Sequence, residues 1–352
     1  MRVLVAPLDW GLGHATRCIP VIRELQRQGC DVMIAGSGDS LRLLKKEFPS
    51  VRAFDLPAYE PRYPSSGSMA WTMACQLPRF MRVISEEHDV VGKLIARENV
   101  QRVISDNRYG CWSERIPAAL ITHQSNILMP DGFGWMENFV AALNAKMIIQ
   151  FTVCWIPDVP GEHSLAGRLT AFEKSGARIR KEYIGWLSRF QVSGNVNKIY
   201  DVLAVFSGPE PQRTIFENKV ACQLKNSRLE YRVVRGLPAC GEPPADERTV
   251  NFLSSADLQR EMESASLVIA RSGYSTVMDM ATLGKKALFV PTPGQTEQEY
   301  LAERLTQKGI AFHTKQKTFD LETAMEEARR FSGFPVAPEN SLLAEAIKRF
   351  LA

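Results

Sequence analysis

The sequence lacks the features that mark a membrane-spanning, disulfide-bonded or zinc-binding protein. No run of about 18 apolar residues occurs, so we expect no transmembrane helix. The seven cysteines are widely spread and none belongs to a CxxC pair, which fits free thiols in a reducing cytoplasm. Low-complexity segments and internal repeats are missing as well. These absences point to an ordinary globular protein.

The low net charge and the absence of several motifs exclude further classes of protein. The formal net charge is only +4 and the Lys and Arg residues are scattered, so nucleic acid is not an expected partner. A P-loop and a Gly-x-Ser-x-Gly elbow are absent, and no group of His, Cys and carboxylate residues has metal-ligand spacing. We therefore expect no tightly bound metal and no other cofactor.

The sequence alternates short apolar strands with amphipathic helices. The first strand, residues 1–6, is too short for a signal peptide, since Asp9 and nearby glycines interrupt the apolar run. A chain of 352 residues usually forms two domains, and the alternation predicts an α/β fold with a parallel sheet in each. We expect one domain over residues 1–188 and a second over 189–335. A C-terminal helix within 336–352 can pack back on the first.

The first candidate site follows the first strand, in the segment DWGLGHATR of residues 9–17. Gly11 and Gly13 let backbone amides approach an anion where a helix begins. Thr16 replaces the third glycine of a dinucleotide fingerprint, which disfavours a nicotinamide cofactor. The positive end of the helix dipole keeps a histidine at this position neutral. His14 is thus a candidate base, and simple helix capping is the alternative.

The second candidate site, ARSGYSTVMD of residues 270–279, also joins a strand to a helix. Ser272 is the expected N-cap, and the amides from Gly273 onward would face a phosphate. Ser272, Thr276 and Asp279 share one helix face because of their spacing. The Asp279 carboxylate can accept hydrogen bonds from a vicinal diol such as a ribose, and a solvated surface carboxylate is the alternative.

Two further strand-to-helix turns in the second half carry polar side chains. Glu297 and Gln298 follow an apolar strand, where they can bind sugar hydroxyls. Ser207, Gly208 and Arg213 lie in an earlier turn, where Arg213 can neutralise a phosphate. Each turn alone also fits a capped helix start or a proline-stiffened turn. Four such turns, drawn from both halves, would converge on one cleft if the domains face each other.

The motifs GLGH at residues 11–14 and RSG at 271–273, with Asp279 and Gln298, resemble the GT-B glycosyltransferases related to MurG. The similarity is most specific over residues 267–311. It implies a GT-B fold, in which two Rossmann-like parallel-sheet domains face a central cleft. It also implies an inverting, metal-independent hexosyltransferase. The implied donor is a nucleotide-sugar, UDP-linked, and the implied acceptor is a cell-envelope glycan or a lipid-linked molecule.

The resemblance also assigns roles to single residues. Asp279 would bind the ribose, Leu253 the uracil through its backbone, and Gln298 with Glu297 the donor sugar. The diphosphate would lie at small residues in two turns of the second half: Ser272, Gly273, Thr276, Ser207 and Gly208. Pro209 and Pro211 depart from the family's glycine-rich turn, because proline has no amide proton to donate.

The resemblance also implies that the first half of the chain supplies the catalytic base. His14, presented by its glycines, would deprotonate an acceptor hydroxyl that attacks the anomeric carbon from the face opposite the leaving diphosphate. Asp106 ends a strand in the segment SDNRYG of residues 105–110. It is either a second base or the residue that orients His14.

Two other functions stay open. The string GLGHATRC of residues 11–18 also resembles the nucleotide-sugar hydrolase of pseudaminic acid synthesis, which gives the sugar to water. A non-catalytic nucleotide-sugar-binding protein would need the same cleft without a working base. The long proline-containing loop at 56–68 and the aromatic stretch at 133–155 offer surface for a larger acceptor, which favours transfer.

We expect a cytoplasmic protein that can also contact the inner face of the membrane peripherally. A group of aromatic residues among basic ones in the first domain suggests such contact. They are Trp71, Phe80, Phe133, Trp135 and Phe139. Ordinary core aromatics are the alternative.

Overall fold

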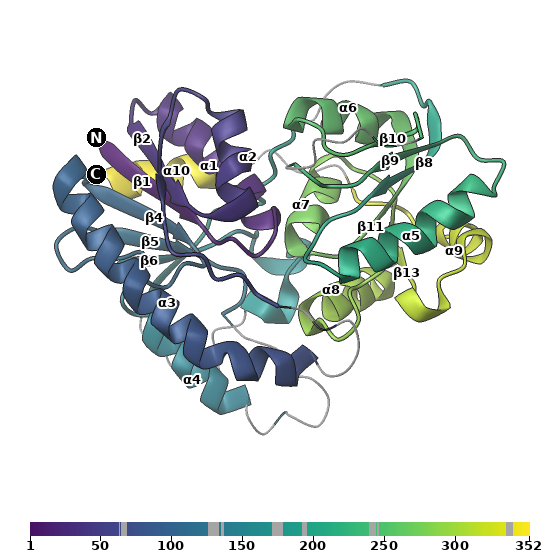
Figure 1. The fold of residues 1–352 in the computed structure, drawn as a ribbon. Coiled ribbons are helices and arrows are strands. Elements are labelled where there is room, and N and C mark those ends of the chain that lie inside the picture. The colour runs from purple at the N-terminus through teal and green to yellow at the C-terminus, as the bar shows by residue number, and fades with distance from the viewer. Residues whose placement is uncertain are drawn as a thin grey trace. The chain divides into compact units, whose positions relative to one another are not determined.

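The computed structural model describes residues 1–62, 64, 69–125, 134, 137–170, 179–191, 196–238, 244, 246–335 and 341–352. The chain divides into two units. Unit 1 comprises Met1–Pro61, Met73–Leu187 and Glu339–Ala352, and unit 2 comprises Arg62–Thr72 and Ser188–Pro338. Each is a parallel sheet with helices on both faces (Figure 1). Within the described ranges, no helix has the length and apolar character needed to cross a membrane.

The sheet of unit 1 has seven parallel strands in the order β3-β2-β1-β4-β5-β6-β7. They are β1 (Arg2–Pro7), β2 (Asp31–Gly36), β3 (Arg52–Asp55), β4 (Arg102–Asp106), β5 (Ala118–Ile121), β6 (Val153–Ile156) and β7 (Arg180–Tyr183). The strand order reverses at β1, which lies between β2 and β4. Pro7 pairs with Asp106, so the carboxyl ends of β1 and β4 lie side by side. Ligands of open parallel sheets usually bind at such a reversal.

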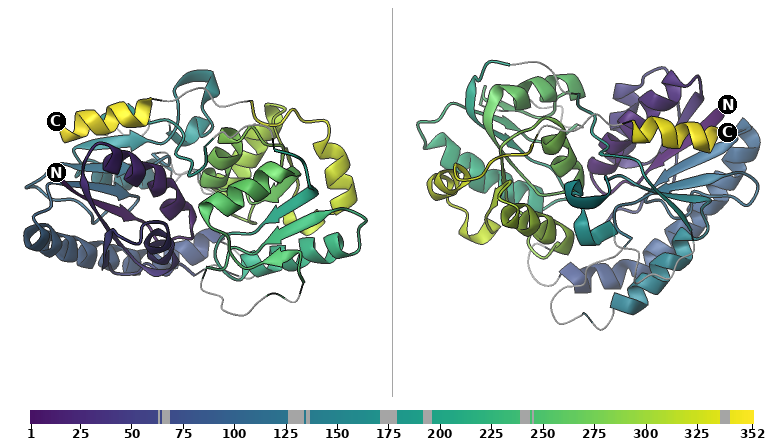
Figure 2. Two further views of the ribbon diagram at one scale, coloured as in Figure 1. Left: turned by 90° about the horizontal axis from the view of Figure 1, so that it is seen from above. Right: turned by 180° about the vertical axis from the view of Figure 1, so that it is seen from behind.

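The helices of unit 1 cover both faces of this sheet. On one face lie α1 (Gly13–Arg27), α2 (Gly38–Glu47) and α10 (Leu342–Leu351), and on the other α3 (Met69–Glu98) and α4 (Glu137–Ile148) (Figure 1). The short 3-10 helices η2 (Gly161–His163) and η3 (Gly167–Thr170) follow β6. Hydrogen bonds hold α10 on unit 1, among them those from Gln28 to the Ala344 carbonyl and from Arg102 to the Phe350 carbonyl, and both chain termini lie there (Figure 2).

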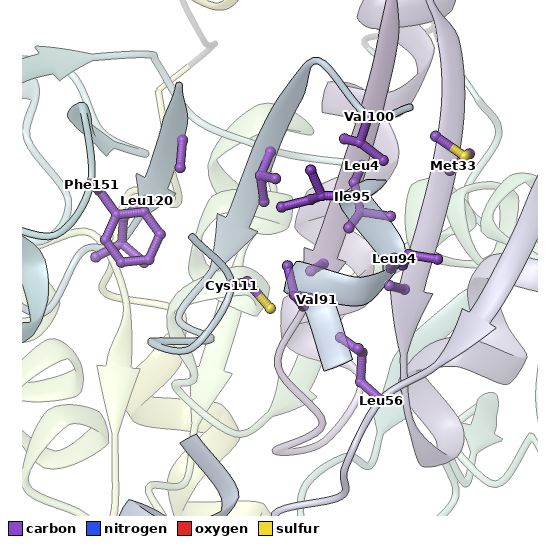
Figure 3. Close-up of a cluster of buried hydrophobic side chains, with 14 of the residues drawn as sticks. Leu4, Met33, Leu56, Val91, Leu94, Ile95, Val100, Cys111, Leu120 and Phe151 are labelled. Carbon is purple, nitrogen blue, oxygen red and sulfur yellow. The ribbon is translucent and has the colours of Figure 1, made fainter. Parts of the chain in front are cut away.

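The core of unit 1 forms because strand residues with a period of two meet helix residues with a period of 3.6. Leu4 and Leu120 from the strands join Val91 and Leu94 of α3 in one buried cluster (Figure 3). Each such side chain contributes about 1.5–3 kcal/mol when fully buried. This cluster fixes β1 and β4, and therefore the site at their carboxyl ends.

Unit 2 has a six-stranded parallel sheet in the order β10-β9-β8-β11-β12-β13. The strands are β8 (Tyr200–Val205), β9 (Tyr231–Val234), β10 (Thr249–Val250), β11 (Ala265–Ala270), β12 (Ala287–Phe289) and β13 (Phe312–His313). The helices are α5 (Gln212–Lys225), α6 (Ser255–Ser264), α7 (Tyr274–Thr282), α8 (Thr296–Gln307) and α9 (Leu321–Ala328), with the 3-10 helix η4 (Gln316–Thr318). Phe216 of α5 and Leu321 of α9 pack with Ile269 of the central strand β11.

The expected α/β architecture, two parallel sheets in strand–helix alternation, is confirmed. The sequence did not predict two short strands, β7 and β13. β7 lies at the end of the stretch expected to be irregular, where its polar residues gave no apolar run. β13 has only two residues, too few for a periodic pattern.

Candidate functional site

The site of unit 1 forms where β1 and β4 end. Gly11 turns the chain with a positive φ of 79°, which glycine adopts without strain, and α1 then begins at Gly13. His14 therefore stands in the first turn of α1. Asp106 is the last residue of β4, and its Oδ1 lies 2.9 Å from His14 Nδ1. The structure thus brings together the two residues that the sequence suggested for catalysis.

A third residue, Arg17, joins this pair. It lies one turn after His14 on α1, and its Nε and Nη2 donate to the two carboxylate oxygens of Asp106. Burial would raise the pKa of Asp106, but Arg17 and then His14 hold it at about 2. A carboxylate with so low a pKa is a poor proton acceptor at neutral pH, so the geometry favours Asp106 as an orienting group over a second base.

His14 has the properties of a base. Burial, and next the charge of Arg17, lower its pKa below 6.5, whereas Asp106 acts in the opposite direction. The ring is therefore neutral at pH 7. Its side chain is 16% exposed while that of Asp106 is fully buried, so only His14 of the two is open to a substrate.

A second buried ion pair supports the turn before α1. Arg108 donates from Nε to the Pro7 carbonyl at 2.7 Å and pairs with Glu87 of α3. Asp9 accepts hydrogen bonds from Ser37 at 2.9 Å and from the Tyr59 amide at 3.0 Å. These contacts hold the segment that leads into the glycine turn. Arg17, Arg108 and Glu87 were not predicted as parts of the site, although Arg17 and Arg108 both stood in the quoted segments.

Besides Asp9 Oδ1, which faces Arg108 Nη2 at 3.8 Å, two buried polar atoms near this turn lack a hydrogen-bond partner among the described residues. They are Trp10 Nε1, next to Gly11, and Asn107 Oδ1, next to Asp106. Asn107 also has a positive φ of 54°, an uncommon conformation for a residue other than glycine. Buried polar groups are usually satisfied, so both atoms are candidates to contact a ligand.

The site of unit 2 lies where β11 meets α7. The N-cap of α7 is Gly273, so the expectation of Ser272 in this role was wrong. Ser272 is fully buried, and its hydroxyl donates to the Gln298 carbonyl at 2.8 Å. Gln298 Oε1 accepts from the Thr292 amide at 2.9 Å, and a Cβ at Gly273 would lie 3.9 Å from Gln298 Nε2. Ser272, Gly273 and Gln298 are therefore neighbours, with half-buried Thr276 in the first turn of the helix.

Asp279 is a buried carboxylate rather than a solvated one. It is 5% exposed, and burial raises its pKa to about 6, although Arg189 and Ser188 oppose the rise. Its Oδ1 accepts a hydrogen bond from the Ser188 hydroxyl at 2.6 Å, and Arg189 Nε lies 3.7 Å from Oδ2. Its burial and raised pKa make Asp279 a candidate ligand-binding residue.

Arg271 has a structural role in unit 2. Its buried guanidinium donates to the carbonyls of Val290 and Pro291 at 3.0 Å each and to that of Gln212 at 2.9 Å. It also lies over the ring of Phe216. Burial lowers its pKa to about 9. The arginine of the RSG motif thus joins β11 to its neighbours and leaves ligand contact to the serine and glycine that follow.

The remaining predicted donor residues are spread over other turns of unit 2. Arg213 is 5% exposed and pairs with Glu210 and Glu217, so two carboxylates already match the charge that was expected to neutralise a phosphate. Half-buried Ser207 precedes Gly208, whose φ is 102°. Leu253, just before α6, and Glu297, in the first turn of α8, are half-buried too.

Part of the proposed membrane patch lies outside the described residues: Phe133, Trp135 and the side chain of Phe139. Trp71 on α3 is 70% exposed. Phe80 is a core residue instead, with a ring centroid 5.3 Å from that of Trp10. In the described part of the chain, no group of three or more His, Cys, Asp or Glu residues has a geometry that could hold a metal ion.

Comparison with known proteins assigns the chain to a known class. Residues 216–345, which include the site of unit 2, match the glycosyltransferase family 28 C-terminal domain. The chain is 23% identical over 333 residues to an uncharacterized glycosyltransferase of Methanosarcina acetivorans, covering 88% of this chain and 84% of that protein.

A shorter stretch of 101 residues is 33% identical to the UDP-N-acetylglucosamine–N-acetylmuramyl-(pentapeptide) pyrophosphoryl-undecaprenol N-acetylglucosamine transferase of Acidiphilium cryptum. This match covers 27% of each chain.

Solved structures show the same fold. Acinetobacter baumannii MurG superposes with a TM-score of 0.54 at 15% identity, over 99% of this chain and 94% of that one. The spinosyn rhamnosyltransferase SpnG, solved with thymidine diphosphate, superposes with a TM-score of 0.60 at 15% identity, over 99% and 95%. The two parallel sheets are thus those of the GT-B fold, the class shared by many glycosyltransferases.

The chain is a glycosyltransferase with a GT-B fold, and residues 216–345, most of which lie in its second unit, match the C-terminal domain of glycosyltransferase family 28.

Proposed function

We propose that this protein is an inverting glycosyltransferase that binds a UDP-sugar on unit 2 and uses His14 of unit 1 as the catalytic base. The observation that carries the proposal is the 2.9 Å contact between His14 Nδ1 and Asp106 Oδ1. A carboxylate on one ring nitrogen orients the imidazole and stabilises the positive charge that it gains when the other nitrogen takes a proton.

The proposed reaction is a single displacement. His14 Nε2 removes the proton of an acceptor hydroxyl, and the oxygen attacks the anomeric carbon of the donor sugar. The bond from that carbon to the diphosphate oxygen breaks, and the nucleoside diphosphate leaves with the electron pair. Attack from the opposite face inverts the anomeric configuration.

Unit 2 would hold the donor. Gly273, the N-cap of α7, makes no side-chain cap hydrogen bond and has no Cβ, so a diphosphate would be able to approach the start of the helix, where the helix dipole stabilises negative charge. Gln298 keeps its Nε2 side toward Gly273, where it can donate to a hydroxyl of the donor sugar. Asp279 would accept the ribose hydroxyls, with Ser188 standing in for them in the free protein.

We further propose that the transferred group is a hexosyl unit, with a cell-envelope glycan or lipid-linked molecule as acceptor. The Acidiphilium cryptum relative, by its name, transfers N-acetylglucosamine to an undecaprenol-linked acceptor. A cytoplasmic location with peripheral membrane contact follows from such an acceptor, and Trp71 is an exposed aromatic side chain suited to it.

The test uses a panel of nucleotide-sugars with a cell-envelope lipid extract, and it follows release of nucleoside diphosphate. His14→Ala should bind the donor as the natural protein does and should lose about 10²–10⁴-fold in turnover. Activity should survive EDTA, because helix amides rather than a metal would stabilise the leaving group. An unchanged rate in His14→Ala would contradict the role of the base.

The same panel without acceptor separates transfer from hydrolysis. The GLGHATRC string leaves hydrolysis as the second candidate, since water can take the place of the acceptor hydroxyl at His14. Rapid and stoichiometric release of free sugar from one donor would establish the hydrolase and overturn transfer. Donor binding without turnover under any condition would indicate a non-catalytic binding protein.

A further inference from the structure

Arg17 contacts the proposed base His14 and two polar residues beside it, Asp106 and His123. Its Nη2 lies 2.9 Å from His14 Nδ1, and its Nη1 lies 3.0 Å from Nδ1 of His123, just after β5. Two of its nitrogens also donate to Asp106. Its side chain is 2% exposed. A bidentate guanidinium–carboxylate pair in so buried a place has a fixed geometry, which a lysine cannot reproduce.

The donor inventory of these groups restricts where protons can lie. A guanidinium only donates, so His123 Nδ1 must be the acceptor and must carry no proton. His14 Nδ1 faces both Asp106 and Arg17 at 2.9 Å and can satisfy only one of them. If it donates to Asp106, Nε2 is left with a free lone pair. If it accepts from Arg17, the proton sits on Nε2 and the ring cannot act as a base.

We propose that Arg17 is a positioning residue for His14. Its guanidinium keeps Asp106 ionised and turned toward His14 Nδ1, so that Nδ1 carries the proton and Nε2 remains free. The inference rests on the proposed function in that a base is needed, but the protonation pattern itself is a property of unit 1 alone.

Arg17 has a second effect through its charge. The ionisable groups acting on His14 are Arg17 on the same helix, Asp106 at the end of β4 and His123 after β5. Cys18 faces Asp106 with its thiol at 3.7 Å. Of these, Asp106 alone favours a protonated imidazole. Without Arg17, the Asp106–His14 pair keeps one proton up to a higher pH, whichever of the two holds it.

The experiment is an NMR titration of the full chain labelled with ¹⁵N-histidine, which has only five histidines to resolve. In the natural protein, His14 should show a protonated Nδ1 and an unprotonated Nε2 at pH 7.5, and His123 the reverse. In Arg17→Gln, the midpoint of proton uptake seen at His14 should rise by about 1–2 pH units. The acid limb of the pH profile of kcat/KM should move by the same amount.

Matched variants separate this role from a structural one. Arg17→Lys keeps the positive charge and should return the midpoint most of the way to that of the natural protein. Arg23→Gln removes an exposed arginine of the same helix, paired with Glu47, and should leave both readouts unchanged.

The proposal would be overturned if Arg17→Gln folds and the midpoint of proton uptake at His14 stays where it is in the natural protein. If this variant does not fold, the tautomer in the natural protein decides, since a proton on His14 Nε2 overturns the proposal on its own. The NMR result does not depend on turnover, so a protein inactive with every donor would refute the proposed function without deciding the role of Arg17.

Discussion

Replacement of Asp279 by asparagine should weaken donor binding without weakening the fold. The Asp279 side chain is buried, and its pKa rises from 3.8 to about 6 on folding. At about 1.4 kcal/mol per pH unit, this rise corresponds to about 3 kcal/mol. Because the folded pKa is raised, the favourable contribution is fully present below pH 3.8 and is lost as the pH rises through about 6. Above pH 6 the ionised Asp279 therefore destabilises the folded state.

Asparagine has nearly the same shape and no charge to desolvate. Its Oδ1 can still accept from Ser188, which lies 2.6 Å from the carboxylate oxygen. Asp279→Asn should therefore be at least as stable as the natural protein at pH 8 and should lose that advantage at pH 4. Donor binding should suffer, because hydrogen bonds to a charged acceptor contribute about 1.5–3 kcal/mol, or roughly 10- to 150-fold in Kd.

The assay combines thermal unfolding at pH 4 and pH 8 with calorimetric titration of UDP at pH 8. Asp320→Asn is a control, since Asp320 is an exposed carboxylate that caps α9. Two results would refute the reasoning. One is UDP binding by Asp279→Asn as tight as that of the natural protein. The other is a large loss of stability at pH 8, which would make Asp279 a structural residue.

Three further substitutions test single contacts. Ser188→Ala should tighten UDP binding roughly fivefold in calorimetry, because the hydroxyl no longer competes for Asp279, and weaker binding would contradict this. Gly110→Ala should cost about 1–3 kcal/mol in urea unfolding, since a Cβ would lie 2.8 Å from the Glu87 carboxylate and closer still to the α3 backbone. Arg271→Met should cost roughly 3 kcal/mol or more by the same method, because it leaves buried carbonyls unpaired. Wild-type stability in either variant would refute these packing arguments.

Much of the fold could be predicted because strand and helix periods are local properties. The β1–α1 and β11–α7 junctions were found from apolar runs that end in glycine-rich turns. The prediction of Ser272 as the N-cap was wrong because tertiary contacts decide which of two neighbouring residues caps the helix. Ser272 turns its hydroxyl to the Gln298 carbonyl, and no local pattern encodes that bond.

The site could be predicted only in part, for a similar reason. His14 stood out because it follows a Gly-x-Gly turn, and Asp106 because it ends a strand. Arg17 looks like any helix arginine until β4 brings Asp106 beside it. The sequence suggested that Arg213 can bind a phosphate, but in the structure Arg213 forms an ion pair with Glu217, one turn along the same helix. Burial and pairing of charges depend on the assembled sheet, so sequence spacing alone does not give them.

The most direct test of the proposed mechanism compares the natural protein with His14→Ala, each measured for UDP-sugar binding and for turnover with acceptor. Donor affinity should be equal in the two proteins. The natural protein should give a product of inverted anomeric configuration, and the variant should lose about 10²–10⁴-fold in turnover. Turnover by His14→Ala at the natural rate, or a product that retains the configuration of the donor, would contradict the mechanism.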